Sequence, residues 1–335
     1  MKIKAYAIKE KGGNAEPFFY ERTFGKNDIL VSVTHCGIGM GDIQFIKNDW
    51  GDTKYPMVPG HEIVGSVEEI GEEVTGFVRG DRVGIGYQQE ACFECEFCKE
   101  GNEQFCPKQK VIAVDCYGGL ADYIVVDERF AFKLPSKLDS AKSVPLMSAG
   151  LTVYSAIKKA KLQSNSTVAV LGIGGLGQLA IQFLHKMEHK VYGFSRSPEK
   201  KMMIEPVGAE YVDSSDLRNM IGYNRKFDFI LSTLNVDFDL DPYLKMLKSH
   251  GKFCLVAAPL KRLSISGGAL YDCAQRTIYG NYIGSRKDMA DMLAFSENHD
   301  IASHVEVMPF SKMNEAIEIV RRRKVSMRLV LENGK

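Results

Sequence analysis

The sequence predicts an α/β protein with two domains, one rich in β-strands and one built on a doubly wound parallel sheet. Two patterns carry this prediction. From Thr167 onward, short apolar runs rich in β-branched residues alternate with helical patterns, which is typical of a parallel sheet covered on both faces. Before Pro145, short strands, many glycines and turns favour a β-rich, barrel-like domain. A chain of 335 residues is long enough for about two domains with a sizeable core.

The expected elements follow from the same periodicities. In the β-rich part we expect strands at residues 29–34, 62–70 and 82–86. In the doubly wound part the expected strands are residues 167–171, 189–194, 227–231, 253–257 and 277–283, and the expected helices are residues 178–187, 198–207 and 241–248.

Composition excludes several classes of function. The chain has 43 basic and 42 acidic residues, a formal net charge of +1, and so gives no electrostatic reason to expect a nucleic acid or a membrane surface as partner. Residues 1–10 are not a charged-then-apolar leader, and no apolar run approaches the ~20 residues of a membrane span. We therefore expect a soluble, cytoplasmic enzyme that acts on a small molecule.

Four closely spaced cysteines predict a metal site. They have the spacing C-x2-C-x2-C-x7-C and are Cys92, Cys95, Cys98 and Cys106. In a chain without a secretion signal, such spacing indicates metal ligands rather than disulfides. Four thiolates close a tetrahedron around zinc and leave no position for a substrate, so we expect one structural zinc per chain.

A glycine-rich motif predicts a dinucleotide site. The apolar run 167–171 precedes it and a helical pattern follows it, and this context favours a pyrophosphate bound at a helix N-terminus. The candidate cofactor-binding residues here are Gly172, Gly174, Gly175, Leu176 and Gly177.

The end of the next strand predicts which dinucleotide binds. An enzyme that prefers NAD places an acidic residue about twenty positions after the glycines, where it accepts the ribose hydroxyls. This chain instead has Ser195, Arg196 and Ser197, followed by Lys200. Hydroxyls and a guanidinium suit a 2′-phosphate, so we expect NADP(H).

A family resemblance rests on two further segments. Residues 36–42 are Cys-Gly-Ile-Gly-Met-Gly-Asp, and residues 60–62 are Gly-His-Glu. The chain resembles the zinc-dependent alcohol dehydrogenases of the medium-chain family, most closely the cinnamyl alcohol dehydrogenase branch, whose motif is Cys-Gly-Ile-Cys-His-Thr-Asp before Gly-His-Glu. The resemblance covers essentially the full chain.

The resemblance implies an arrangement of domains. Residues 1–145 and 287–335 would form a GroES-like catalytic domain with a structural zinc lobe at about 90–108, and residues 146–286 would form a Rossmann NADP(H)-binding domain. It also implies that Thr152 approaches the nicotinamide and that the protein is a homodimer.

The departures from the family motif lie at positions that bind the catalytic zinc in the family. Gly39 stands where the family has a ligand cysteine, and Ser148 stands where it has a second one. Asp42, His61 and Glu62 remain, and with Ser148 they are the candidate catalytic residues. A serine hydroxyl replaces a zinc-bound thiolate poorly, so a standard catalytic zinc is doubtful.

These residues leave three hypotheses about function. The first is NADP(H)-dependent hydride transfer to a small, conjugated aldehyde, ketone or activated alkene without a standard catalytic zinc, because a substrate with its own electron sink needs less help from a Lewis acid. Its proton donor would be Tyr87, Tyr117 or Ser148. The second is a zinc-dependent alcohol or aldehyde dehydrogenase whose metal site is rearranged around His61 and Glu62, with Asp42 or Cys36 as a further ligand. The third is a catalytically silent NADP(H)-binding protein.

Overall fold

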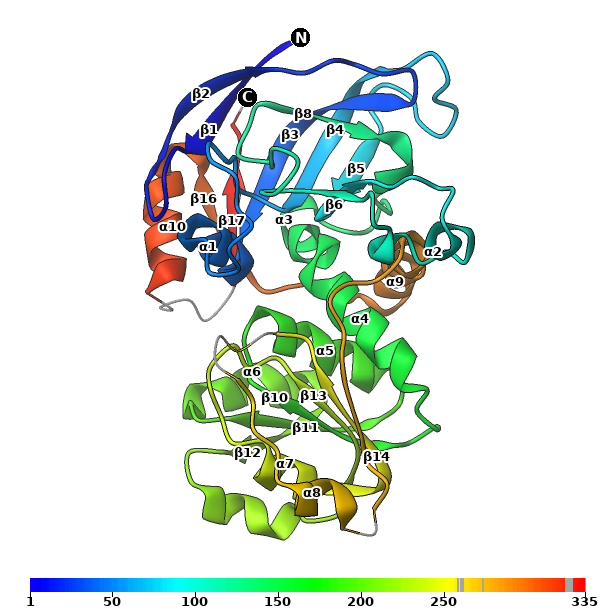
Figure 1. Cartoon of the computed structure of the whole chain (residues 1–335), viewed down its shortest axis with the longest axis vertical. Coiled ribbons are helices and arrows are strands. Elements are labelled where there is room, and N and C mark those ends of the chain that lie inside the picture. The colour runs from blue at the N-terminus through cyan, green and yellow to red at the C-terminus, as the bar shows by residue number, and fades with distance from the viewer. Residues whose placement is uncertain (258, 260–261, 273, 323–327, 335) are drawn as a thin grey trace. The chain divides into compact units, whose positions relative to one another are not determined.

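Two compact units make up the chain, as seen in a computed structural model (Figure 1). Unit 1 is Met1–Ser148 with Ser285–Lys335, and unit 2 is Ala149–Gly284. The structure describes residues 1–257, 259, 262–272, 274–322 and 328–334. None of the helices formed by these described residues has the length and apolar character required to cross a membrane.

A seven-stranded sheet forms the centre of unit 1. Its strand order is β16-β17-β3-β4-β5-β9, with β8 also paired to β3. All of its pairs are antiparallel except β16 with β17. The strands are β3 (Asp28–Ile38), β4 (Glu62–Ile70), β5 (Arg82–Ile85), β8 (Tyr123–Asp127), β9 (Ala131–Lys133), β16 (Val305–Pro309) and β17 (Arg328–Glu332).

Smaller elements complete unit 1. Two separate two-stranded sheets are formed by β1 (Lys2–Ile8) with β2 (Ala15–Glu21) and by β6 (Gln88–Glu90) with β7 (Lys110–Val111). The helices are α1 (Met40–Lys47), α2 (Glu96–Lys99), α3 (Ser140–Ser143), α9 (Arg286–His299) and α10 (Met313–Arg321), with 3-10 turns η1 (Glu103–Phe105), η2 (Glu128–Phe130), η3 (Val144–Met147) and η7 (Phe310–Lys312).

One edge of β3 is shared by two partners. Its first half, from Asp28 to Ser32, pairs with β8, and its second half, from His35 to Ile38, pairs with β17. The late strand β17, red in Figure 1, therefore lies directly beside β3, which is blue. This pairing brings residues almost 300 positions apart in sequence to the same end of one sheet.

Unit 2 is a six-stranded parallel sheet in the order β12-β11-β10-β13-β14-β15. The order reverses between β10 and β13, which makes the carboxyl end of β10 a topological switch point where doubly wound folds bind ligands. The strands are β10 (Thr167–Leu171), β11 (Lys190–Ser195), β12 (Ala209–Asp213), β13 (Phe227–Ser232), β14 (Leu247–Leu255) and β15 (Thr277–Gly280).

Helices and aromatic side chains build the core of unit 2. Tyr192, Phe194, Phe227 and Phe253 are all buried in one apolar cluster. The helices are α4 (Ala149–Ala160), α5 (Gly175–Lys186), α6 (Lys201–Ile204), α7 (Asp241–Lys245) and α8 (Gly267–Tyr271), with 3-10 turns η4 (Pro198–Lys200), η5 (Glu205–Val207) and η6 (Leu217–Tyr223).

The expected mixed α/β class is confirmed, but several element boundaries were wrong, among them the end of the strand expected at 29–34, which continues to Ile38. The helix expected at 241–248 ends at Lys245, and β14 already begins at Leu247, because the backbone of Lys226 and Phe227 pairs with Met246. The helix expected at 198–207 is broken into η4, α6 and η5, and Pro206 accounts for the last break because it lacks an N–H donor. The strand expected at 277–283 ends at Gly280.

Candidate active site

Asp42 fixes the position of His61 in unit 1. Asp42 lies in the first turn of α1, and its carboxylate accepts the backbone N–H groups of Gly39 and Gly60 at 2.8 Å each. Its Oδ1 lies 2.9 Å from Nδ1 of His61. Because an ionised carboxylate can only accept, Nδ1 carries the proton and Nε2 is the acceptor of the neutral ring. One side chain thus sets both the orientation and the tautomer of the imidazole.

Charge and burial act in opposite directions on this pair. Burial favours the neutral form of His61, but the Asp42 carboxylate and its hydrogen bond outweigh burial and raise the pKa of His61 above its usual value. Burial likewise favours neutral Asp42, whereas the charge of His61 and the hydrogen bonds from His61, Gly39 and Gly60 lower the pKa of that carboxyl. The pair therefore holds its charges more strongly than burial alone would allow.

Arg328, the first residue of β17, lies beside Gly39 and Glu62. The pairing of β17 with β3 sets Leu329 opposite Ile38, so the next step of the ladder sets Arg328 opposite Gly39. Nη2 of Arg328 donates to the buried carboxylate of Glu62. Nη1 lies 2.8 Å from the point where a Cβ at residue 39 would sit. A side chain at residue 39 would therefore require the guanidinium, the flexible end of a long side chain, to shift.

The donor set around His61 does not fit a three-ligand zinc site. Within the described part of the chain, the four-cysteine cluster is the one group of three or more His, Cys, Asp or Glu residues whose ligand atoms all lie within 4.8 Å of one another. Burial, with the charges of Asp42 and Glu62, raises the pKa of the Cys36 thiol well above its usual value. A protonated thiol is a poor metal ligand, and the guanidinium of Arg328 already places a cation beside Glu62.

Ser148 follows η3 and is the last residue of the first segment of unit 1. The turn η3 packs against β3, β4 and β5. Its Val144 comes within 2.9 Å of the point where a Cβ at Gly37 would sit, so the turn lies against the strand that leads to α1. Ser148 itself is partly exposed.

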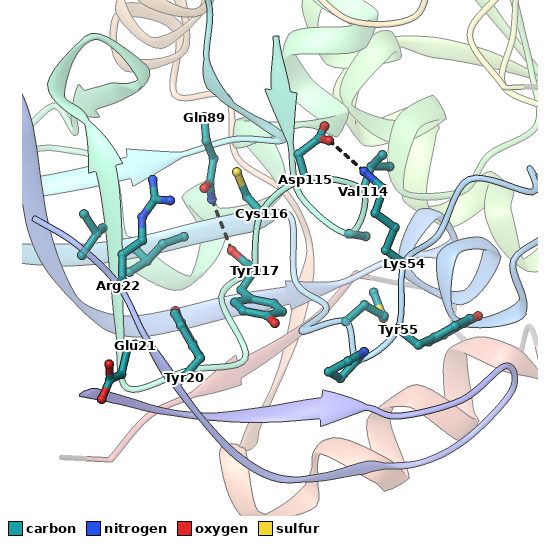
Figure 2. A pocket seen from close by; sticks show the side chains of 15 residues that line it. Tyr20, Glu21, Arg22, Lys54, Tyr55, Gln89, Val114, Asp115, Cys116 and Tyr117 are labelled. Atoms are coloured by element: carbon teal, nitrogen blue, oxygen red, sulfur yellow. Dashed lines mark hydrogen bonds and ion pairs between the residues drawn. The ribbon is translucent and has the colours of Figure 1, made fainter. Parts of the chain in front are cut away.

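The structure separates two of the candidate proton donors. The ring of Tyr87 stands perpendicular to the ring of His61, with centroids 6.4 Å apart. The ring of Tyr117 instead lies 4.5 Å from that of Tyr20 and lines a cavity of about 310 Å³ (Figure 2). Neither His61 nor Glu62 lines that cavity. Tyr87 therefore has the closer association with the imidazole.

The four cysteines of unit 1 form a compact cluster. Their sulfur atoms all lie within 4.8 Å of one another, with Cys92 Sγ 3.4 Å from Cys106 Sγ and 4.0 Å from Cys98 Sγ. Thiolates bound to zinc at ~2.3 Å lie about 3.8 Å apart at the corners of a tetrahedron. The cluster fits a structural zinc site.

Backbone N–H groups prepare this cluster to hold negative charge. The N–H groups of Cys95 and Lys108 point at Cys92 Sγ and Cys106 Sγ at 3.4 Å. Such donors, those of Glu94 and Cys95 foremost, lower the pKa of the Cys92 thiol to about 6. Burial instead raises the pKa of the Cys98 thiol to about 12. Since zinc binds the thiolate form, the lowered pKa of Cys92 favours metal binding at that ligand.

Two arginines tie the cysteine loop to the rest of unit 1. The guanidinium of Arg129 lies 3.7 Å from the ring centroid of Phe93, which stands in the loop with a φ of +56°. Arg286, the first residue of α9, lies 5.2 Å from the same ring, and its Nη1 is 3.4 Å from the carboxylate of Glu103. The loop is thus held on both sides by cation–π contacts and an ion pair.

The glycine-rich turn of unit 2 has the geometry of a phosphate cradle. Gly172 follows β10 with a φ of +85°, a conformation that favours glycine. A Cβ at Gly177 would lie 2.0 Å from the carbonyl oxygen of Gly172, so helix α5 packs against the turn as only glycine allows. Gly174 is the N-cap of α5, and a Cβ there would meet no atom within 4 Å. The turn leaves room for an anion at the N-terminal end of α5.

The polar residues expected at the ribose end gather where β11 finishes. Ser195 is the last residue of β11, and its Oγ accepts the N–H of Ser197 at 3.1 Å. Arg196 between them is exposed. Lys200 lies in η4, where partial burial lowers its pKa. Two serine hydroxyls and two cations therefore follow the end of one strand.

Thr152 lies in a separate network of the same unit. It is buried in α4, its Oγ1 donates to the carbonyl oxygen of Tyr282 at 3.3 Å, and its own carbonyl accepts from the Asn281 side chain at 3.1 Å. Lys159 donates to the amide oxygen of Asn281 at 2.9 Å. These bonds join α4 to the segment that follows β15.

Two family models match the chain. The model for the alcohol dehydrogenase GroES-like domain matches residues 25–136, and the model for zinc-binding dehydrogenase matches residues 175–298. An aldehyde reductase of Synechocystis sp. is 36% identical over 99% of both chains. The chain belongs to the medium-chain, zinc-type alcohol dehydrogenase family. A probable cinnamyl alcohol dehydrogenase of Eucalyptus globulus is 38% identical, over 98% of this chain and 95% of the relative.

Solved structures place the chain in the cinnamyl alcohol dehydrogenase-like branch of that family. A cinnamyl alcohol dehydrogenase of Sorghum bicolor superposes with a TM-score of 0.94 at 32% identity, over 99% of this chain and 98% of the other. A cinnamyl alcohol dehydrogenase from Helicobacter pylori, solved with NADP(H), gives 0.92 at 32% identity over 100% and 99%. The predicted resemblance and fold class are confirmed, with a GroES-like and a Rossmann-type domain, and the chain is an alcohol dehydrogenase-type oxidoreductase.

Arg328 is the site residue that the sequence did not reveal. It follows a basic stretch at 321–324 and begins an apolar strand, so nothing local distinguishes it from a solvated charge. Its position follows only from the register of β17 on β3, a pairing across the whole length of the chain.

Proposed function

We propose that this protein is an NADP(H)-dependent reductase of a small, conjugated aldehyde, ketone or activated alkene, and that it works without a standard catalytic zinc. In this proposal Asp42, His61, Glu62 and Ser148 form the catalytic side in unit 1. The glycine turn after β10, the residues at the end of β11 and Thr152 bind the dinucleotide in unit 2.

The dinucleotide assignment is supported by the end of β11. A 2′-phosphate carries negative charge, and Arg196 and Lys200 stand there with the hydroxyls of Ser195 and Ser197. None of these four residues offers the carboxylate that would accept the free ribose hydroxyls of NAD. The Helicobacter pylori relative was solved with NADP(H), which agrees with this choice.

The observation that carries the metal part of the proposal is the donor set around His61. Gly39 offers no ligand atom and Ser148 offers only a hydroxyl where the family resemblance implies two thiolates. Among the described residues, His61 belongs to no group of three or more His, Cys, Asp or Glu residues whose ligand atoms all lie within 4.8 Å of one another.

The substrate class is supported by the relatives and by chemistry. The relatives are named for aldehyde reduction and for cinnamyl alcohol, a conjugated alcohol. A bound NADPH would supply the hydride. A conjugated substrate spreads the developing negative charge over its own π system, so it depends less on a Lewis acid than a simple aldehyde does.

Zinc content per chain tests the proposal. Wild type and Cys95→Ser are purified in metal-free buffer, and zinc is measured by plasma mass spectrometry alongside cinnamaldehyde reduction with NADPH and with NADH. We expect one zinc in wild type and its loss in Cys95→Ser. We also expect that a chelator added to the assay leaves turnover with NADPH unchanged, because no metal acts at the active site. Two zincs in wild type, with chelator-sensitive turnover, would instead support a rearranged zinc site. Tight NADPH binding with no turnover on any carbonyl or alkene would support the silent binding protein.

A further inference from the structure

A cavity of about 310 Å³ lies in unit 1, apart from the proposed catalytic residues (Figure 2). None of the four proposed catalytic residues lines it, and every residue that does belongs to the first segment of unit 1. Its volume is at the lower end of the range for sites that hold small organic molecules. The cavity is therefore large enough for a compact ligand.

Two tyrosine rings form an aromatic wall of this cavity. The ring centroids of Tyr20 and Tyr117 lie 4.5 Å apart, and both rings contact Phe18, which lies in β2 with Tyr20. The apolar side chains of Met57 and Val114 also line the cavity. Aromatic rings bury a large apolar area and pack well against another ring. The wall therefore favours a ligand with a flat, apolar body.

The uncharged polar groups in the cavity are mainly hydrogen-bond donors. The hydroxyls of Tyr20 and Tyr117 donate to no other described residue. Burial raises the pKa of the Cys116 thiol to about 11 and also raises the pKa of Tyr20, so both groups keep their protons at neutral pH. A phenol or thiol that keeps its proton can donate it. A ligand that displaces water from these groups must therefore offer acceptor atoms.

Cations outnumber carboxylates beside these donors. Nη2 of Arg22 lies 3.0 Å from one carboxylate oxygen of Glu90, and Nζ of Lys110 lies 2.6 Å from the other. All three charges act on the pKa of Cys116, so they lie close to its thiol. One carboxylate cannot neutralise two cations, and the positive charge that remains attracts an anion.

The other charged residues that line the cavity do not cancel this excess. Lys54 and Asp115 form a neutral pair at 3.3 Å. Glu21 is exposed, and in Figure 2 its carboxylate points away from the other labelled side chains. The cavity thus combines an aromatic wall, free donors and an unbalanced cation.

We propose that this cavity is a binding site for a small aromatic carboxylate. The carboxylate accepts hydrogen bonds from the guanidinium of Arg22 and the hydroxyl of Tyr20, and charge-assisted bonds of this kind are among the strongest that a protein makes. The ring of the ligand packs against the tyrosine wall. The site does not depend on the proposed reductase function, because it shares none of the proposed catalytic or dinucleotide-binding residues and its occupancy is measured without turnover.

Calorimetric titration with benzoate and with benzamide tests the charge and the place together. Benzamide has the same ring but no charge. The variants are Arg22→Gln, which leaves Glu90 paired with Lys110, and Tyr20→Phe, which removes one hydroxyl and keeps the ring. Arg79→Gln is the matched control, because Arg79 also pairs with a glutamate of unit 1, Glu68 at 3.3 Å, and does not line the cavity. Melting temperatures verify that each variant is folded.

We expect benzoate to bind wild type and Arg79→Gln equally, and benzamide to bind about tenfold more weakly or less. Arg22→Gln should weaken benzoate binding by about tenfold or more, and Tyr20→Phe by about fivefold. Benzoate that binds near His61 instead would keep its Kd in both cavity variants, and that result would overturn the inference. Failure of millimolar benzoate to bind wild type, or equal binding of benzamide, would overturn it as well.

Covalent labelling of Cys116 locates the bound ligand directly. Cys116 lines the cavity and is partly exposed, whereas Cys36 and Cys254 are buried and serve as internal controls. Wild type is treated with methyl methanethiosulfonate at about pH 9, where a small fraction of the thiol is ionised, and labelled peptides are measured by mass spectrometry. Saturating benzoate should slow the labelling of Cys116 severalfold. An unchanged labelling rate would place the ligand elsewhere and refute the site, whether or not the protein is a reductase.

Discussion

Gly60 carries two constraints at a single residue. Its φ is +96°, and an added Cβ would lie 2.3 Å from Cys36 Sγ and 3.2 Å from the backbone nitrogen of Leu120. Its N–H also donates to Asp42, so the backbone at residue 60 cannot shift without disturbing the group that orients His61. Glycine at this position is required by conformation, by space and by the hydrogen bond together.

We therefore expect Gly60→Ala to lower the free energy of unfolding by about 3 kcal/mol or more, combining a left-handed backbone cost of about 1–2 kcal/mol with overpacking. Gly12→Ala is the control, because Gly12 has a φ of +77° but no atom within 4 Å of its missing Cβ. That control should cost only about 1–2 kcal/mol. Urea unfolding measures both, and equal losses would show that the contact with Cys36 is unimportant.

The Asp42–His61 pair predicts a pH-dependent stability. A raised folded pKa of His61 means that its contribution is fully present below the unfolded pKa and is lost as pH rises through the folded value. Asp42→Asn removes the attraction, so it should cost about 3 kcal/mol at pH 6 and about 1 kcal/mol well above the raised pKa. Urea unfolding from pH 6 to pH 9.5 tests this slope. A destabilisation independent of pH would mean that Asp42 acts only through its backbone hydrogen bonds.

Single residues also show where prediction from sequence succeeds and where it stops. Asp42 lies beside His61 because its carboxylate accepts both the N–H of Gly60 and the imidazole hydrogen bond, so two short motifs that the sequence shows meet through one side chain. The position of Arg328 depends on a strand pairing that spans nearly the entire chain, and no periodicity within one segment reports such a pairing. The sequence showed that residue 39 is a glycine without a ligand side chain, but it did not show that Arg328 lies beside it.

At the scale of elements, the turn after β11 is where cofactor choice should be decided. We expect Arg196→Ala to weaken NADPH binding by about 10- to 100-fold, because charge-assisted hydrogen bonds contribute about 1.5–3 kcal/mol. NADH binding, which involves no 2′-phosphate, should stay unchanged. Calorimetric titration of both dinucleotides tests this, with Arg218→Ala as an exposed control in the same unit, paired with Asp216. Equal weakening of NADH binding would indicate that the substitution disrupts the structure of the whole turn.

The elements of unit 2 were predicted better than their ends. β10 and α5 have strong local patterns, an apolar β-branched run and a glycine N-cap, and both lie where the sequence placed them. β14 runs through the polar segment from Lys248 to Lys252, with His250 at a φ of +61°. The ladder with β13 is irregular between Leu247 and Lys252, pairing with β15 begins only at Lys252, and the N–H of His250 donates to the carbonyl oxygen of Ala274; such tertiary support is not visible in local propensity.

For the whole molecule, the two units should respond to different ligands. Each has its own buried core, the cysteine cluster lies in unit 1 and the glycine-rich turn in unit 2. In calorimetry we expect NADP⁺ at 100 times its Kd to stabilise the unit 2 transition by about 2.7 kcal/mol. Removal of zinc by a strong chelator should lower the unit 1 transition by several degrees or more. A single transition that both treatments shift equally would show that the chain unfolds as one cooperative body.

The place of β17 beside β3 has a consequence during synthesis. A ribosome must translate all of unit 2 before Arg328 and the strand that carries it exist, so half of one edge of β3 waits unpaired while more than two hundred further residues are added. Until then Glu62 has no Arg328 to pair with, and the backbone of residues 35–38 presents open N–H and C=O groups to any other extended segment. The nascent chain is thus most exposed to mispairing at the strand end that later forms the candidate active site, and chaperone demand should be greatest before that last strand emerges.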